Sequence, residues 1–235
     1  MKKQNPFLTA EWRDLVMMNY EVDPGLLRSY LPSGTELDFW QGKALVSMVG
    51  FMFLKTKVLG VPIPFHSNFE EVNLRFYVRR KMPEGWRRGT VFVKEIVPRW
   101  AIATVARVCY NENYEAMPMR HEISENSYQF DWRYEQKWNS LQALTAGDFQ
   151  NLVPGSEEEF ITEHYWGYSK QPNGSTIEYQ VEHPAWRVRR VREAHFDCDV
   201  KGLYGAEFVE SLQAEPVSAL VAEGSAVTVY QGVKL

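Results

Sequence analysis

The residues best suited to chemistry lie in the segment from Phe69 to Arg80, which alternates between apolar and polar side chains. This two-residue period is typical of a half-buried β-strand. Its polar face presents Glu71, Asn73, Arg75 and Tyr77: a carboxylate, an amide, a guanidinium and a phenol. Such groups bind a small polar ligand and transfer protons if the face points into a closed sheet. If the face points to water, it is an ordinary charged surface.

Two further groups of polar and aromatic residues could join this face. They are Arg107, Tyr110, Glu112, Tyr114, Met119, Arg120 and His121, and then Glu163, His164, Tyr165, Trp166 and Tyr168. Arg107 alternates in phase with small apolar residues, so it either points inward to a partner or extends to solvent from a strand end. Glu163 and His164 are adjacent and point to opposite faces of a strand, so each would act with a residue from another strand.

Common catalytic and nucleotide-binding motifs are absent from the sequence, including GxGxxG, GxxxxGK[ST], GxSxG and HExxH. The five histidines do not have metal-ligand spacing. A site assembled from distant strands, with His121, His164, His183 and Glu163, is the alternative. We expect no metal and no cofactor.

The composition favours a globular protein of the cytoplasm. The 235 residues are 45% hydrophobic and 14% aromatic, with a formal net charge of -4, which gives no reason to expect nucleic acid or a membrane as partner. The two cysteines lack CxxC spacing, as expected in a reducing compartment. The first six residues lack the apolar stretch of a signal peptide, and the apolar run at 44–54 is too short to span a bilayer.

Most of the chain has the sequence pattern of β-strands. The pattern predicts them at 14–22, 35–40, 44–54, 69–80, 90–97, 101–110, 128–138, 163–170, 175–183 and 224–231. The run at 44–54 is apolar on both faces, which indicates a central strand covered on both sides, and a turn at 41–43 pairs it with 35–40. Gln171-Pro172-Asn173-Gly174 predicts a hairpin turn. The segment 139–153 is polar and weakly patterned.

Helix signals are few. Asp23 and Pro24 open a short helix through Tyr30, and Ser156 with Glu159 forms a capping box. A third short helix is expected at 206–213. Many strands with few helices predict one mainly-β domain over residues 1–235, built as a barrel or curled sheet.

At the polar clusters the chain resembles the DUF2071 family, which is related in fold to acetoacetate decarboxylase. The resemblance rests on Leu8-Thr9-Ala10-Glu11-Trp12, the strand from Phe69 to Arg79, Ala106-Arg107 with Tyr110 through Pro118, Glu163-His164-Tyr165-Trp166-Gly167-Tyr168, and Glu223-Gly224-Ser225. It implies a curled antiparallel sheet that closes into a cone-like barrel around a ligand cavity. It therefore favours the inward orientation of the polar faces.

The resemblance departs from the decarboxylase pattern at its nucleophile. That pattern has Gly-Arg-Glu followed by Pro-Lys-Lys, whose first lysine forms the Schiff base. Here Ala106-Arg107 is followed by Pro118-Met119-Arg120, and neither a thioether nor an always-protonated guanidinium forms an imine. Glu71 resembles the family's active-site glutamate.

Three functions stay open. The first is a barrel that binds a small organic acid or related metabolite, with or without hydration, isomerisation or lactone opening. Its acid–base residues are Glu71 and His121, and its ligand-binding residues are Asn73, Arg75, Arg107, Tyr110, Tyr114, Met119, Arg120, Glu163 and Tyr168. The second is a Schiff-base enzyme that uses Lys94. The third is a structural or partner-binding protein whose polar faces meet solvent. The sequence leaves open whether the chain forms a homodimer.

Overall fold

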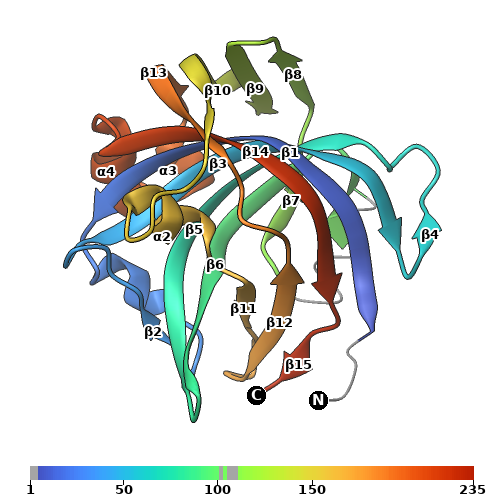
Figure 1. Cartoon of the computed structure of the whole chain (residues 1–235), viewed down its shortest axis with the longest axis vertical. Helices are drawn as coiled ribbons and strands as arrows, with labels where there is room; N and C mark the ends of the chain where they lie inside the picture. The colour runs from blue at the N-terminus through green and yellow to red at the C-terminus, as the bar shows by residue number, and fades with distance from the viewer. Residues whose placement is uncertain (1–4, 101–102, 105–110) are drawn as a thin grey trace.

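The computed structural model describes residues 5–100, 103–104 and 111–235, and its strands form one large sheet (Figure 1). The longer strands are β1 (Pro6–Val22), β3 (Ala44–Val58), β5 (Phe69–Met82), β6 (Gly85–Val97), β9 (Ser127–Tyr134), β10 (Lys137–Gln150), β12 (Thr176–Glu182), β13 (Val188–Asp197) and β14 (Ser218–Tyr230). The shorter strands are β2 (Glu36–Leu37), β4 (Val61–Pro62), β7 (Tyr114–Ala116), β8 (Met119–Ile123), β11 (Trp166–Lys170) and β15 (Val233–Lys234). The helices are η1 (Leu26–Ser29), α2 (Glu157–Thr162), α3 (Val200–Leu203), η2 (Ala206–Phe208) and α4 (Val209–Gln213).

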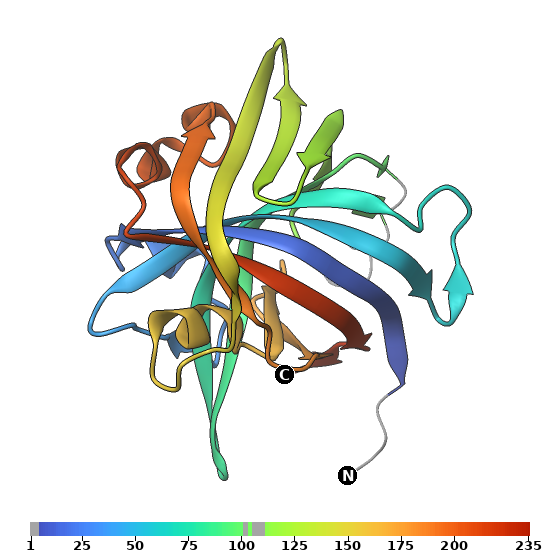
Figure 2. The same cartoon turned by 45° about the horizontal axis from the view of Figure 1, so that its top comes forward.

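Seven strands close into a ring. They follow the order β12-β11-β6-β5-β3-β1-β14, and β14 pairs back with β12 at Val181–Val229 and Glu182–Thr228. Strands β13, β10, β9 and β8 continue the sheet from β14, and Figure 2 shows β13, β10 and β9 rising above the ring. The mainly-β fold with few short helices is confirmed. The sheet is mixed rather than purely antiparallel, because β6 pairs in parallel with β7 and β11.

Strand β3 is covered on both faces, as its apolar sequence predicts. One face packs into the ring interior with Phe160 and Ile161 of α2. The other packs against β9 and β10, where a side chain at Gly50 would lie 2.8 Å from the Phe130 ring. Glycine therefore permits the close approach of the two layers. This central strand contributes to the two larger apolar cores of the described residues, one on each of its faces.

The predicted capping box and hairpin turn are both present. The Ser156 hydroxyl accepts a hydrogen bond from the Glu159 amide at 3.2 Å, and the Glu159 carboxylate accepts one from the Gly155 amide at 2.7 Å. Gln171 and Gly174 close the turn between β11 and β12 with a backbone bond of 2.9 Å. These local signals fix where α2 begins and where the hairpin reverses.

Four expected elements differ from the structure. Strand β2 pairs with β5 instead of β3, because the turn at 41–43 closes only the isolated bridge Trp40–Lys43. The expected strand 128–138 spans most of β9 and the start of β10, and 139–153 lies largely in the long strand β10, where Asn139 and Thr145 are buried and Ser140 and Gln142 are half-buried. Of the expected strand 101–110, the described residues Ala103 and Thr104 are helical and the rest lies outside the described residues. The helix expected from Asp23 is a single 3-10 turn, η1.

Candidate functional site

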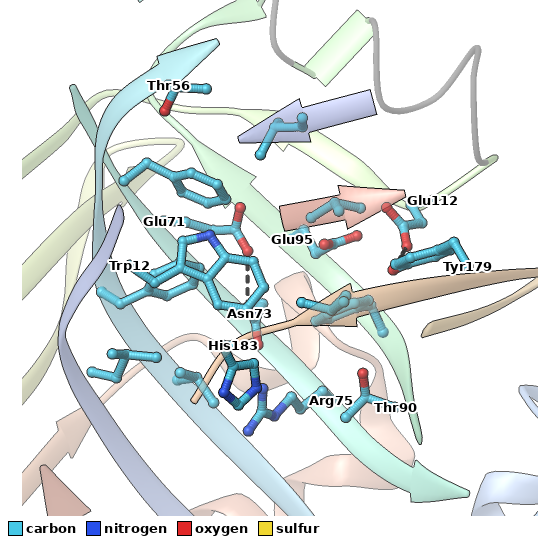
Figure 3. A pocket seen from close by; sticks show the side chains of 18 of the residues that line it. Trp12, Thr56, Glu71, Asn73, Arg75, Thr90, Glu95, Glu112, Tyr179 and His183 are labelled. Carbon is cyan, nitrogen blue, oxygen red and sulfur yellow. Dashed lines mark hydrogen bonds between the residues drawn. The ribbon is translucent and has the colours of Figure 1, made fainter. Parts of the chain in front are cut away.

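A cavity with a volume of about 130 Å³ lies inside the ring (Figure 3). One water needs roughly 10–15 Å³ of such space, so the cavity has room for a small organic molecule. Its described polar lining residues come mainly from β5, β6, β7, β12 and the segments that flank them. They are Thr56, His66, Glu71, Asn73, Arg75, Thr90, Glu95, Glu112, Tyr114, Thr162, His164, Tyr179 and His183.

Strand β5 turns its polar face into this cavity. The side chains of Glu71 and Asn73 are each only 2% exposed, while the apolar residues between them pack in the opposite core. Figure 3 shows Glu71, Asn73 and Arg75 in sequence along the strand. The face is therefore not a solvent-exposed ladder of charge pairs, which removes the premise of the structural-protein hypothesis.

Glu71 is held at both carboxylate oxygens. Asn73 donates to its Oε1 at 2.9 Å, and the Tyr114 hydroxyl of β7 donates to its Oε2 at 3.0 Å. Burial raises the pKa of Glu71 to about 7, although both hydrogen bonds and the nearby Arg75 charge oppose that rise. The group therefore exchanges a proton close to neutral pH, which suits a general acid or base.

Two more glutamates share the cavity with Glu71. Burial raises the pKa of Glu112 to about 7, against a hydrogen bond that the Tyr179 hydroxyl donates to Glu112 Oε1. Burial, followed by repulsion from Glu112 and Glu71, raises the pKa of Glu95 well above its usual value. Because like charges compete for ionisation, the three carboxyl groups titrate as one coupled set.

Arg75 faces the same space without an acidic partner. Its Nη2 donates to the Ile161 carbonyl at 3.3 Å and lies 3.8 Å from the Met17 sulfur, and its Nε has no hydrogen-bond partner in the described chain. None of the salt bridges among the described residues includes this guanidinium. A half-buried cation left unpaired in this way is unfavourable unless a ligand supplies the anion.

Two histidines of the lining have lowered pKa values. His164 packs against the rings of Tyr77 and Phe160, at centroid distances of 4.7 and 5.3 Å. Burial lowers the pKa of His164 to about 4, against the pull of the Asp38 carboxylate 3.4 Å away. Burial likewise lowers the pKa of His183. Arg75 is thus the permanent cation among the described lining residues.

The opposite wall is aromatic. Trp12 contacts Phe51, Phe53 and Trp186 at centroid distances of 5.5, 5.7 and 6.3 Å, and Phe53 stacks on Phe69 at 4.7 Å. Buried polar atoms without a partner in the described chain also line the cavity. They include Trp12 Nε1, Thr56 Oγ1, Asn73 Oδ1, Arg75 Nε and Glu95 Oε2. Buried polar atoms are normally satisfied, so this concentration indicates a binding site.

The structure brings four of the predicted site residues together. Glu71, Asn73, Arg75 and Tyr114 all line the cavity. Arg107 and Tyr110 lie outside the described residues, so their roles stay predictions. The regular alternation of β5 explains why its three residues face the same cavity.

Three predicted residues on β8 lie away from the cavity, because β8 pairs with β9 at the far edge of the sheet extension. Met119 packs against the core on the other side of β5. Arg120 is exposed and pairs with Asp131 at 2.7 Å, and His121 Nδ1 lies 3.4 Å from Glu70 Oε2. We therefore withdraw the expected roles of these three side chains.

Two predicted residues near β11 are also outside the lining. Tyr165 donates a hydrogen bond to Glu163, which precedes β11 instead of lying within it. Tyr168 is buried in the opposite core. Neither residue takes part in the cavity that Glu71 faces.

Sequence reasoning missed Glu95 and Tyr179 as site residues, and named Glu112 without assigning it a role. A glutamate inside the apolar run 90–97 is the one sequence signal for Glu95. Tyr179 and Glu112 lie 67 residues apart, and no local pattern connects them. Their contact depends on the β11–β12 hairpin lying beside β6 in the ring.

The described lining residues include no lysine. Lys94 instead pairs with Glu115 at 2.9 Å. Within the described chain no group of three or more acidic, histidine or cysteine side chains could hold a metal ion. Among the same described residues, no helix is long and apolar enough to cross a membrane.

Sequence comparison identifies a family and a related protein. Residues 9–226 match DUF2071, a family described as an uncharacterised conserved protein. The uncharacterised protein YqjF of Bacillus subtilis (strain 168) is 28% identical over 206 residues, which cover 85% of this chain and 82% of that protein.

Solved structures with a similar fold include two enzymes. Acetoacetate decarboxylase from Legionella pneumophila has a TM-score of 0.69 at 13% identity, over 97% of this chain and 87% of that chain. The enduracididine biosynthesis enzyme MppR, complexed with pyruvate, has a TM-score of 0.68 at 11% identity, over 100% of this chain and 91% of that chain. At such identities the likeness establishes the fold alone.

Proposed function

The chain belongs to the DUF2071 family and has an acetoacetate decarboxylase-like fold, and from this premise we propose that it binds a small organic acid in the cavity through Arg75. The observation that carries the proposal is the cavity-facing guanidinium without an acidic partner among the described residues. A ligand carboxylate would accept charge-assisted hydrogen bonds from it. The complex of MppR with pyruvate gives a small acid bound to a protein of similar fold.

The binding proposal is tested by a thermal-shift screen of short carboxylic, oxo and hydroxy acids. A ligand at 100 times its Kd stabilises the native state by about 2.7 kcal/mol and raises Tm. We expect selective shifts in the wild type that Arg75→Ala abolishes. Arg120→Ala is the matched control, because Arg120 is exposed and outside the cavity. Equal shifts in wild type and Arg75→Ala would reject the assignment.

A second function follows from Glu71, whose pKa of about 7 lets it both accept and return a proton at neutral pH. In its carboxylate form Glu71 would take a proton from the ligand carbon next to a carbonyl, while Arg75 holds the ligand carboxylate. Return of that proton to another position completes an isomerisation. We expect the enzyme to exchange this carbon-bound hydrogen for deuterium from solvent, measured by NMR. Glu71→Gln should abolish exchange yet retain binding, and unchanged exchange in Glu71→Gln would reject the role.

The proposed chemistry does not use a Schiff base. Support comes from the described lining, which contains no lysine, and from the ion pair of Lys94 with Glu115. The lysines outside the described residues are Lys2 and Lys3 alone. Acid–base chemistry by Glu71 requires no amine nucleophile.

A further inference from the structure

The cavity has a second charged end, built from acids. Glu71 of β5 and Glu95 of β6 are buried in one lining and Glu112 before β7 is half-buried there, and the charges of Glu71 and Glu112 raise the pKa of Glu95. Figure 3 shows Arg75 and His183 apart from Glu95 and Glu112. The lining is thus polarised, with a cation at one end and three carboxyl groups at the other.

This acidic end has hydrogen-bond acceptors but few remaining donors. The hydroxyl of Tyr114 already donates to Glu71, and that of Tyr179 to Glu112. Glu95 is 1% exposed and its Oε2 has no partner in the described chain. Asn73 donates its amide to Glu71, which leaves its Oδ1 as a second unpartnered acceptor. A group rich in N–H donors would satisfy both atoms.

The charge balance of the lining also favours a ligand group that carries a positive charge. Three ionised carboxylates against one guanidinium would leave the lining negative, so burial and mutual repulsion hold this acidic end largely protonated in the free protein. A ligand that carries its own cation balances this excess and stabilises the ionised carboxylates. A neutral ligand would leave these carboxyl groups protonated.

We propose that the ligand is an amino-bearing organic acid, with its carboxylate at Arg75 and a cationic nitrogen among Glu71, Glu95 and Glu112. The inference rests on the proposed binding function and adds the chemical class of the ligand. Binding of the cation favours ionised carboxylates, so protons leave the site. The titrating or charged neighbours of these carboxyl groups are Tyr114 of β7, Tyr179 of β12 and Arg75 of β5.

Calorimetry with matched ligand pairs tests the proposal. The amino acids β-alanine, γ-aminobutanoate and δ-aminopentanoate are compared with butanoate, pentanoate and hexanoate, in which a methyl group replaces the ammonium group. We expect at least one amino acid to bind about tenfold more tightly than its partner, a difference of about 1.4 kcal/mol. Heats measured in buffers of different ionisation enthalpy should show proton release on binding.

Variants assign the preference to the acidic end. Glu95→Gln should remove the preference for the amino acid and retain the affinity for the plain acid. Glu112→Gln carries the same expectation if Glu95→Gln does not fold. Glu115→Gln is the matched control, because Glu115 neighbours Tyr114 in β7 but pairs with Lys94 outside the lining. This control should keep the full preference.

The possible results distinguish a failure of this inference from a failure of the binding function on which it rests. Plain acids that bind as tightly as the amino acids, and lose affinity in Arg75→Ala, would overturn the cationic ligand and support the carboxylate site. A tenfold preference that persists in both Glu95→Gln and Glu112→Gln would also overturn the assignment. No binding of either series to the wild type would overturn both proposals.

Discussion

The ring of Tyr179 occupies the space that a side chain at position 167 would need. Gly167 and Tyr179 are cross-strand partners in the β11–β12 pair, and a Cβ on Gly167 would lie 2.0 Å from Tyr179 Cζ. With no side chain there, the tyrosine lies across β11 and its hydroxyl reaches Glu112. The glycine therefore positions the donor that holds one acid of the cavity.

This relationship predicts that Gly167→Ala displaces Tyr179 and destabilises the fold by about 1–3 kcal/mol, the usual cost of overpacking. Urea unfolding measures the loss. Because the clash is with the ring, Gly167→Ala should cost little in a Tyr179→Ala background, and the double-mutant cycle should be strongly non-additive. Tyr179→Phe is the control, since it keeps the ring and hence the clash. Additive costs would contradict the proposed contact.

The acidic end of the cavity should make stability fall as pH rises. The pKa of Glu71 is about 7 in the native state against 4.5 in the unfolded chain. Between these values the native carboxyl retains a proton that the unfolded state has released, so the native state binds more protons and stability decreases with increasing pH. The difference corresponds to about 3 kcal/mol as an upper bound.

Glu71→Gln removes this titration and should flatten the decline between about pH 5 and about pH 8. Urea unfolding at fixed pH values measures it. Glu70→Gln is the matched control, since the neighbouring Glu70 is outside the cavity lining. Parallel stability curves for wild type and Glu71→Gln would show that Glu71 is not held protonated.

Titration of His164 should instead make stability fall as the pH decreases, over a lower pH range. Burial against the rings of Tyr77 and Phe160 lowers its pKa to about 4 from 6.5. Its stabilising contribution is fully present above pH 6.5. As the pH falls from there toward 4, the unfolded chain gains a proton that the native state does not, and stability is lost.

His164→Gln should reduce that acid-side loss by up to about 3 kcal/mol. Guanidinium unfolding at several pH values gives the measurement. His195→Gln provides the comparison, because His195 is an exposed histidine of β13. A wild-type curve that matches His164→Gln over this range would mean that His164 titrates normally in the native protein.

The sequence predicted the polar face of β5 correctly because the strand is regular from Glu71 to Arg75 and pairs in constant register with β3. On β6 the same alternation is interrupted. There Leu74 pairs with Lys94 but Arg75 pairs with Phe92, so Val93 is an extra residue in a β-bulge. The bulge changes the phase of the strand, which directs Glu95 into the cavity and Lys94 toward Glu115.

Alternation cannot reveal a bulge, because the bulged residue has an ordinary strand composition. Contacts between residues far apart in the sequence could not be predicted either. The ring closes where β12 meets β14, nearly fifty residues apart in sequence, and only this closure makes a cavity from the separate polar faces. Met119 illustrates the same limit. Its position in the Pro118-Met119-Arg120 segment could be identified from the sequence, but its strand β8 lies at the edge of the sheet, away from the ring.

The position of Met119 gives a direct test of the Schiff-base hypothesis. An imine forms only where a lysine amine meets the ligand carbonyl, and Met119 packs against the core on the other side of β5. We therefore expect no covalent adduct when wild type or Met119→Lys is treated with pyruvate and borohydride and analysed by intact mass. An acetoacetate decarboxylase treated in parallel is the positive control. An adduct in the wild type would establish an amine nucleophile, and an adduct in Met119→Lys alone would place residue 119 within reach of the cavity, contrary to the structure.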